Sequence, residues 1–377
     1  MKMKRNDKCW CNSGKKYKHC HYGRKDESPI SKGEAIDFSK RNSQRKGCYV
    51  PEEMKLSCSN KIINAHTISK SGSLMAIADS SNHVFGLKID LPNLIKNNGK
   101  LIPEKIGINQ ASTFKGFCST HDKALFSCIE DKDFIGDDEQ CFALMYRSVA
   151  KEIYAKEGSL NHADFIKAGD KGKDIAQQFF IQEFANRNKI AVEIAISELS
   201  ELKSKLDQRL LKNTNENIHH LIIKSASPIP VVVSSIIAPS INFFGEQIQN
   251  LNNLHVKAEH VVINSLSSAG NGFFVLSWLG ESKKINNFID SLLKDGTSDI
   301  FNKLVKFSFC MAENTFFSPS WWESLSISQQ ERIKNFIMSG VNPFTMEKEI
   351  TYIDNDISFS GWDVQSIKNT RDTDTEH

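Results

Sequence analysis

Residues 8–23, KCWCNSGKKYKHCHYG, place three cysteines and a histidine in a basic stretch with hardly any apolar side chains. A segment this polar cannot bury a hydrophobic core, so a bound metal is expected to hold it together. Three thiolates and one imidazole form the tetrahedral ligand set of a structural Zn²⁺ site. The predicted ligands are Cys9, Cys11, Cys20 and His21. Ser13 and Gly14 fall where the chain must reverse between the two ligand pairs, and glycine accepts the backbone angles of a tight turn.

The alternative to a metal site is a disulfide, or free thiols in a flexible tail. The residues after Met1 argue against it, because Lys2, Lys4 and Arg5 are not followed by the apolar stretch of a secretory signal peptide. We therefore expect a cytoplasmic protein. No apolar run reaches the roughly 18 to 20 residues that span a bilayer, so no membrane segment is expected.

The run CWCNSGKKYKHCH resembles the SEC-C zinc-binding motif, which is known from the tail of a secretion ATPase and is attached to many unrelated bacterial proteins. The resemblance covers about residues 7–24 and implies the same four zinc ligands. Asn12 stands where the motif usually has glycine, and asparagine also tolerates turn conformations. Because the motif serves as a docking module, it implies a protein partner without identifying an activity.

The composition of the 377 residues, 40% hydrophobic and 25% charged, is that of a globular protein with two or three domains. The odd number of cysteines, nine, indicates metal ligation in a reducing compartment. Residues 1–47 hold 14 lysine or arginine residues against 5 aspartate or glutamate residues, a net +9 that leaves −6 for the remainder. This basic arm suits an anionic partner, either nucleic acid or an acidic protein surface. Residues 25–47 are equally well explained as a solvated, disordered linker.

A second group of metal-type ligands begins after this arm, with wider spacing. Cys48 and Cys58 precede a predicted strand, and Cys118-x-x-His121 opens a predicted helix, where two side chains can converge on one ion. The long segment between the two pairs is no obstacle, because the entropy cost of closing a loop grows only logarithmically with its length. The sequence therefore predicts a second zinc site at these four residues. The alternative for Cys58 is a small buried apolar residue.

Between the two ligand pairs, the segment KIINAHTISKSG predicts a short strand that contains His66. The order of cysteine pair, strand with Ala-His-x-Ile, Asn109, and helix with Cys-x-x-His-Asp resembles the zinc-supported HNH or His-Me finger nucleases over residues 48–131. By that resemblance His66 is the general base that activates water, Asn109 is the orienting amide, and Asp122 is a ligand of a catalytic Mg²⁺ or Mn²⁺ ion.

This set of residues suits phosphodiester hydrolysis. An imidazole provides a base near neutral pH, and a carboxylate such as Asp122 is a ligand that Mg²⁺ prefers. The sequence departs from the family pattern at Ala65, which replaces the acidic residue or histidine before the base, and at His121, which replaces a cysteine. Nine residues also separate Cys48 from Cys58, whereas a zinc knuckle usually has two residues between its cysteines. A non-catalytic, zinc-supported fold that keeps the scaffold is the alternative.

The remainder of the chain changes from helical to extended patterns. Apolar periodicity predicts helices over residues 139–156 and 173–213, which would form an antiparallel hairpin. Runs rich in β-branched and aromatic residues predict an antiparallel sheet or half-barrel over residues 218–281. Helices are expected near residues 282–294, 297–312 and 327–339. Trp321 and Trp322 are expected as core anchors, with a stacking surface as the alternative.

The expected fold class is a multi-domain α+β protein. Its predicted parts are a zinc knuckle at residues 1–24, a basic linker at 25–47, a zinc-supported ββα-like module at 48–138, a helical hairpin at 139–217, an antiparallel sheet with helices at 218–366, and a disordered tail at 367–377.

Motifs for several enzyme classes are missing. There is no Walker-type phosphate loop, no dinucleotide-binding glycine fingerprint after a strand and no serine nucleophile elbow. The leading hypothesis is a metal-dependent nucleic-acid endonuclease with a zinc recruitment module, which would suit bacterial defence against foreign nucleic acid. The alternative is a zinc-binding adaptor or sensor that docks to a protein or ribosome-type partner.

Overall fold

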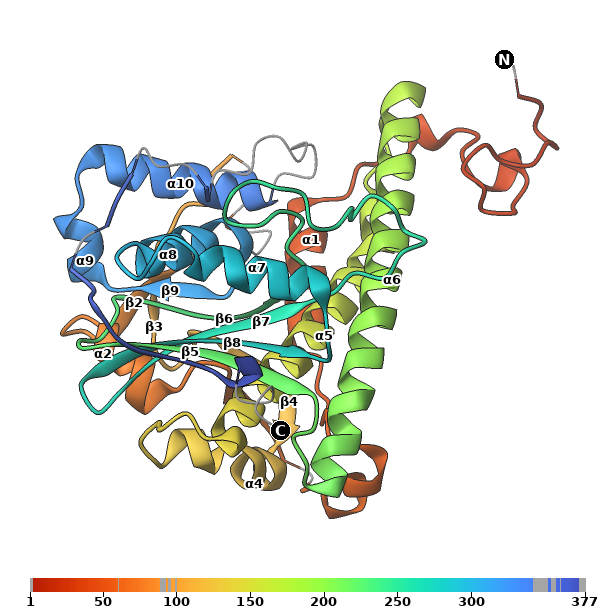
Figure 1. The fold of residues 1–377 in the computed structure, drawn as a ribbon. Helices are drawn as coiled ribbons and strands as arrows, with labels where there is room; N and C mark the ends of the chain where they lie inside the picture. Colours follow the sequence, from red (N-terminus) through yellow and green to blue (C-terminus); the bar gives the residue numbers. More distant parts are fainter. Residues whose placement is uncertain are drawn as a thin grey trace. The chain divides into compact units, whose positions relative to one another are not determined.

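The computed structural model describes residues 3–59, 61–88, 93, 96–98, 100–341, 352–353, 357–359 and 361–372. The chain divides into two compact units, each built from two segments. Unit 1 consists of residues 1–45 and 153–200, and unit 2 consists of residues 46–152 and 201–377. The two long helices α5, Asp138–Ala168, and α6, Ile175–Lys212, contribute to both units (Figure 1).

Unit 1 combines the cysteine-rich segment with three helical segments. Short helical turns at Tyr17–His19 and Arg24–Asp26 lie within and after the cysteine-rich segment. Helix α1, Lys32–Ser43, occupies part of the stretch that the sequence analysis treats as a linker. A capping box begins it, in which Ser31 and Glu34 exchange hydrogen bonds between side chain and backbone. The helix also packs on α5, because the Phe38 ring stacks on Phe165 with centroids 4.4 Å apart.

Helix α5 is longer than its expected end near residue 156, since it continues through Gly158 to Ala168. Glycine has a low helix propensity, but at position 158 it leaves room for the side chain of Arg45. A Cβ atom at Gly158 would lie 2.6 Å from Nη2 of Arg45, which donates to the Tyr154 carbonyl. The turn between α5 and α6 holds Gly172 with a φ of 70°, a left-handed conformation that glycine adopts without strain.

Unit 2 is built on an eight-stranded sheet whose described pairings are all antiparallel. In spatial order its strands are β10 Val364–Asn369, β5 Ile218–Ser225, β8 Asn271–Leu279, β7 Val261–Ser268, β6 Val231–Ile237, β9 Thr315–Phe317, β2 His83–Gly86 and β3 Glu104–Gly107. A two-residue turn at Ala269 and Gly270, both with positive φ, joins β7 to β8 and fixes their register. The predicted strands over residues 218–281 form the centre of this sheet.

The expected boundary near residue 217 does not separate two independent sheets. Strand β9 pairs with β6 on one side and with β2 on the other, so β2 and β3 from the front of the chain extend the sheet. At the opposite edge, β10 and the turn Thr370–Asp372 occupy the start of the segment that we expected to be a disordered tail. Residues 373–377 of that segment lie outside the described residues. These edge strands are short or polar, and they therefore give little sequence signal.

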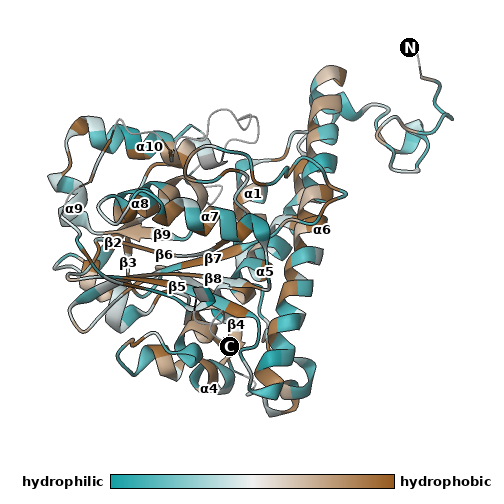
Figure 2. Cartoon of the chain, in the orientation of Figure 1, coloured by the Kyte–Doolittle hydropathy of each residue, from teal (hydrophilic) through white to brown (hydrophobic). Residues whose placement is uncertain are grey.

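Helices cover both faces of the sheet (Figure 1). On one face lie α7 Lys283–Leu293, α8 Ile300–Met311 and α10 Ile327–Val341, and their apolar side chains share one core with β5, β7 and β8. On the other face, Cys141 and Leu144 of α5 pack against Ile222, Phe273 and Val275. The strands are mostly apolar, whereas α6 alternates between apolar and polar residues along its length (Figure 2).

Residues 46–131 add a smaller ββα arrangement to unit 2. Strand β1, Ile62–His66, pairs antiparallel with β4, Thr113–Cys118, and helix α4, Ser119–Glu130, follows β4 directly. The rings of Phe117 and Phe126 meet edge to face with centroids 5.0 Å apart, which packs α4 against β4. The mixed α+β class, with antiparallel sheet and helices, is confirmed.

Among the described helices, none is both long enough and apolar enough to cross a bilayer.

The junction between β2 and β9 generates a stability prediction. A Cβ atom at Gly86 in β2 would lie 2.5 Å from the Phe316 ring of β9. We therefore expect Gly86→Ala to lower the free energy of unfolding by about 1–3 kcal/mol, measured by urea denaturation, because the core must be distorted to admit the methyl group.

Gly107→Ala, in the adjacent strand β3, is the matched control. Its Cβ atom would have only the His83 ring as a neighbour, at 3.8 Å. This variant should differ from the wild type by less than about 1 kcal/mol. Equal effects of the two substitutions would contradict the pairing of β2 with β9.

Candidate functional site

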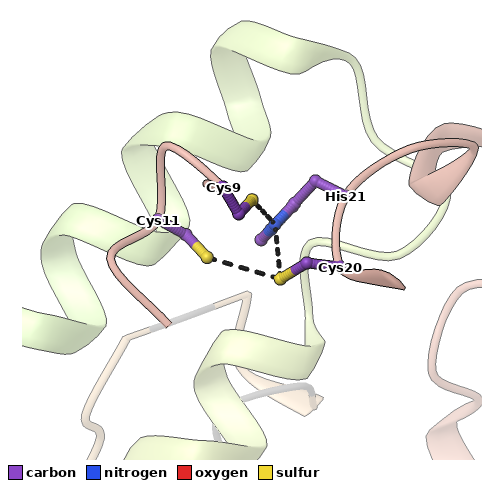
Figure 3. A group of neighbouring side chains, drawn as sticks. All are labelled: Cys9, Cys11, Cys20 and His21. Carbon is purple, nitrogen blue, oxygen red and sulfur yellow. Dashed lines mark hydrogen bonds between the residues drawn. The ribbon is translucent and has the colours of Figure 1, made fainter. Parts of the chain in front are cut away.

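Unit 1 contains the first cluster of metal-type ligands. Cys9 and Cys11 approach Cys20 and His21 from the other side of the turn, as Figure 3 shows. The Nδ1 atom of His21 lies 3.1 Å from the sulfur of Cys9 and 3.2 Å from that of Cys20, and the sulfurs of Cys11 and Cys20 are 3.4 Å apart. The predicted four residues are thus brought together. Asn12 and Gly14 both have positive φ in the turn between them.

These distances fit a four-coordinate zinc ion. Tetrahedral coordination with Zn–S bonds of about 2.3 Å and Zn–N bonds of about 2.0 Å separates the ligand atoms by roughly 3.5–3.8 Å. All four ligand atoms of the cluster lie within 4.8 Å of one another. Cys9, Cys11, Cys20 and His21 could therefore hold Zn²⁺ after only small adjustments.

A buried carboxylate orients the imidazole of this cluster. Asp170 has no exposed surface, and its Oδ2 atom lies 2.8 Å from Nε2 of His21. Its Oδ1 atom accepts a hydrogen bond from Nε of Arg24 at 2.7 Å, and its Oδ2 atom also accepts from Gln182 of α6 at 2.7 Å. A carboxylate on the outer nitrogen fixes the ring tautomer that leaves Nδ1 free to bind a metal. Asp170 also fastens the cysteine-rich segment to the α5–α6 turn.

Unit 2 contains the second cluster, formed by Cys48, Cys58, Cys118 and His121. The Nδ1 atom of His121 lies 3.5 Å from the sulfur of Cys48, 3.4 Å from that of Cys58 and 3.3 Å from that of Cys118. Its other ring nitrogen, Nε2, lies 3.0 Å from the Ser57 hydroxyl. Cys118 ends β4 and His121 lies in the first turn of α4, as the x-x spacing predicts. This arrangement is also compatible with zinc.

The thiols of each cluster differ in acidity. Burial raises the pKa of Cys9 and the pKa of Cys48 to about 12 each. Burial would also raise the pKa of Cys118, but hydrogen bonds from the His121 and Ser59 backbones and the Ser59 side chain outweigh it and lower that pKa to about 6. Metals bind thiolates, and the lowered pKa of Cys118 favours its thiolate form.

His66 lies at the end of β1, opposite Thr113 of β4, and is half-buried. Its Nε2 atom lies 3.0 Å from the Ile108 carbonyl oxygen. A carbonyl can only accept, so Nε2 carries the proton and Nδ1 carries the lone pair. Burial lowers the pKa of His66, which favours a neutral imidazole at pH 7. The His66 ring is therefore oriented so that Nδ1 can accept a proton.

Among the described residues, no hydrogen bond or ion pair joins Asn109 to His66. The side chain of Asn109 is exposed and accepts from Nζ of Lys70 at 3.4 Å, while its neighbour Ile108 supplies the carbonyl that holds His66. Asp122 is half-buried in the first turn of α4, and burial raises its pKa. Within the described parts of the chain, no hydrogen bond or ion pair joins it to His66.

An ion pair that the sequence analysis did not predict lies near both His66 and Asp122. Arg147 of α5, only 2% exposed, donates through Nη1 to Glu130 at the end of α4 at 2.5 Å. Both charges act on the pKa of His66 and on the pKa of Asp122. No sequence signal could have joined residues 17 positions apart on two different helices. Asp170 was missed for the same reason, since it lies 149 residues from His21.

Residues 5–23 match the SEC-C motif. The match contains all four ligands of the first cluster, and it covers a small part of the chain.

Two curated relatives match this chain over a short segment. Methionine aminopeptidase of Chlamydia trachomatis serovar D is 68% identical over 28 residues, which is 7% of this chain and 10% of that protein. Methionine aminopeptidase of Chlamydia muridarum is 70% identical over 27 residues, again 7% of this chain and 9% of that protein. The chain thus spans about a tenth of the length of these relatives. No solved structure matches it.

The two clusters predict the metal content of the chain. We expect elemental analysis of the purified protein to find two zinc ions per chain, with one ion remaining in Cys11→Ser and one in Cys58→Ser, because each substitution removes a ligand from one cluster. Cys128→Ala changes a cysteine outside both clusters and should retain both ions. If the wild-type protein contains only one zinc ion per chain, one of the two clusters is not a zinc site.

The carboxylate of Asp170 generates a second prediction for this site. Asp170→Ala should weaken zinc binding at the first cluster by about 10–100-fold, because the imidazole loses the partner that orients it. Zinc competition with a chromophoric chelator measures this change. Asp164→Ala is the matched control, because Asp164 is an exposed aspartate on α5, the helix that precedes the turn with Asp170. Unchanged affinity in Asp170→Ala would show that Asp170 does not support the metal ligands.

Proposed function

We propose that the protein is a metal-dependent endonuclease that hydrolyses phosphodiester bonds of nucleic acid, with His66 as the general base. The observation that carries the proposal is the setting of His66 in the ββα arrangement of β1, β4 and α4. The second cysteine and histidine cluster lies where β4 meets α4, and the Ile108 carbonyl holds His66 at the end of β1. A zinc ion in this cluster would fix the relative positions of the strand and helix.

The chemistry of His66 follows from its orientation. The lone pair on Nδ1 would accept a proton from water while the water oxygen attacks phosphorus, and the sugar oxygen would leave with the electrons of the broken P–O bond. The Ile108 carbonyl would stabilise the imidazolium by accepting from Nε2. The lowered pKa of His66 supports this role, since a neutral ring is required at the start.

Asp122 and Asn109 are the proposed oxygen ligands for a catalytic Mg²⁺ or Mn²⁺ ion. Such an ion would supply positive charge to stabilise the phosphorane-like transition state. Carboxylate and amide oxygens are ligands that these ions prefer. Burial and the charge of Glu130 raise the pKa of Asp122, and the charge of Arg147 opposes this shift and favours the carboxylate form.

A second function is favoured by the match in residues 5–23. Proteins named methionine aminopeptidase are 68–70% identical to this chain over 27–28 residues, which is only 7% of its length. A segment that occurs on a protein of another activity suits a docking module. We therefore retain an adaptor role as the alternative, in which both clusters are structural and the chain binds a protein or ribosome-type partner without turnover.

Replacement of the proposed base tests the enzyme hypothesis. His66→Ala should slow cleavage of plasmid DNA or labelled RNA in Mg²⁺ or Mn²⁺ by about 10²–10⁴-fold, because general base catalysis contributes that much. The rate of wild-type cleavage should rise with pH and be half-maximal below the ordinary histidine value of about pH 6.5, since the pKa of His66 is lowered.

His83→Ala provides the control, because His83 lies on β2 and its ring contacts only Ser81 within the described hydrogen bonds. It should cleave at the wild-type rate, and both variants should retain the zinc content of the wild type. If His66→Ala cleaves at the wild-type rate, His66 is not the general base. A wild-type protein that holds two zinc ions and cleaves no nucleic acid would support the adaptor.

A further inference from the structure

Unit 1 has an open groove between the cysteine-rich segment and the α5–α6 hairpin. Its volume is about 640 Å³. One wall comes from residues 11–24, and the other comes from Lys167 of α5 and residues 182–190 of α6. Both walls lie within unit 1, so the groove is complete without unit 2.

The charge of the groove is strongly positive. Five of the lining residues are lysine or arginine, and one is acidic. The basic residues are Lys15, Arg24, Lys167, Arg187 and Lys189. The acidic residue, Glu183, accepts a hydrogen bond from Arg187 at 2.8 Å. Arg24 pairs with Asp170 at 2.7 Å, and Lys189 pairs with Glu193 at 3.8 Å. Lys15 lies in one wall and Lys167 in the other, and neither forms an ion pair among the described residues.

The backbone places the lysines of the first wall. The amide of Cys9 donates to the Lys15 carbonyl at 2.9 Å, and Lys8 and Lys16 form an antiparallel bridge around the same turn. Asp170 accepts from Arg24 and from Gln182, which join the first wall to α6. The groove is therefore a fixed surface of the folded unit and not a flexible basic tail.

The remaining lining residues distinguish two kinds of anionic partner. The groove borders the first cluster, since Cys11, Cys20 and His21 line it. The other lining residues are mostly polar, and Ile190 is the only aliphatic side chain; the polar ones are Asn12, Ser13, His19, Gln182 and Asn186. A stable protein partner would need an apolar centre in its interface. Protein surfaces that bind nucleic acid are instead polar and positively charged. The composition of the groove thus favours phosphates.

We propose that this groove binds the sugar-phosphate backbone of a nucleic acid, with Lys15 and Lys167 in direct contact with phosphates. Contacts of this type neutralise charge and carry no sequence information, so binding is expected to be independent of sequence. The proposal does not depend on His66, because all of its residues belong to unit 1. If the endonuclease proposal also holds, the groove recruits the substrate.

Fluorescence polarisation of a labelled single-stranded RNA and of a labelled DNA duplex tests the proposal. The measurement uses the full chain with His66→Ala and no added Mg²⁺ or Mn²⁺, so that cleavage cannot affect it. The double substitution Lys15→Gln with Lys167→Gln should weaken binding by about tenfold at moderate salt. The slope of log affinity against log salt concentration should decrease in magnitude by about 2, because two phosphate contacts are lost.

Lys32→Gln with Lys40→Gln is the matched control, because it removes the same charge from exposed positions of α1 in the same unit. It should bind as the parent protein does. Equal losses in the two double variants would overturn the proposal in favour of nonspecific attraction to the basic arm.

Two other outcomes also overturn it. One is the absence of binding to either nucleic acid, and the other is a polyglutamate peptide that competes as well as RNA, which would indicate an acidic protein partner. Binding without any cleavage by the wild type would leave the groove supported and would refute only the endonuclease proposal.

Discussion

The gathering of three cysteine sulfurs and one histidine nitrogen within 4.8 Å of one another is the arrangement on which the local structure around each cluster depends. His21 and His121 occupy equivalent positions in their clusters, and each has its Nε2 atom held by a second partner. In the first cluster that partner is the buried carboxylate of Asp170, and in the second it is the hydroxyl of Ser57. A ring held on one side can present the other nitrogen to a metal without a further loss of rotational entropy.

The free energy of zinc binding at such sites is large relative to the free energy of unfolding of a domain. Structural zinc sites contribute apparent binding free energies of about 10–16 kcal/mol, whereas whole domains are stable by only about 5–15 kcal/mol. Residues 8–23 contain few buried apolar residues, and Cys9 is the only buried hydrophobic residue described there. The fold of this segment therefore depends on its cluster. The sheet of unit 2 has a large apolar core of its own, so the second cluster acts locally, on β1, β4 and α4.

The two units have different chemical characters. Unit 1 has a polar, positively charged groove that suits recognition by charge. Unit 2 has a half-buried imidazole with a defined tautomer, and the charges of Glu130 and Arg147 affect its pKa. Each unit thus contains a cluster that could bind zinc, together with a nearby group of residues for which we propose a function. The two proposed functions can therefore be tested separately by substitution.

Patterns that are local in sequence predicted much of this arrangement. The spacing of Cys9, Cys11, Cys20 and His21 is short enough for a turn to bring them together, and Cys118-x-x-His121 converges because a helix begins there. The helices α6, α7, α8 and α10 repeat their apolar residues with a helical period, and the strands β5 to β8 are short runs rich in β-branched and aromatic residues. Such periodicity is a property of the chain itself, because it reflects which face of the element is buried.

Contacts between residues that are distant in the sequence could be identified only from the tertiary structure. The pairing of β2 with β9, the carboxylate of Asp170 on His21 and the Ile108 carbonyl on His66 each join segments whose separation leaves no periodic or spacing signal. The sequence by itself determined the ligand sets and the kind of secondary structure, since these depend on neighbouring residues. The tertiary structure alone decided which groups orient the imidazoles, because hydrogen bonds to a buried ring require partners that only the folded chain can bring within about 3 Å.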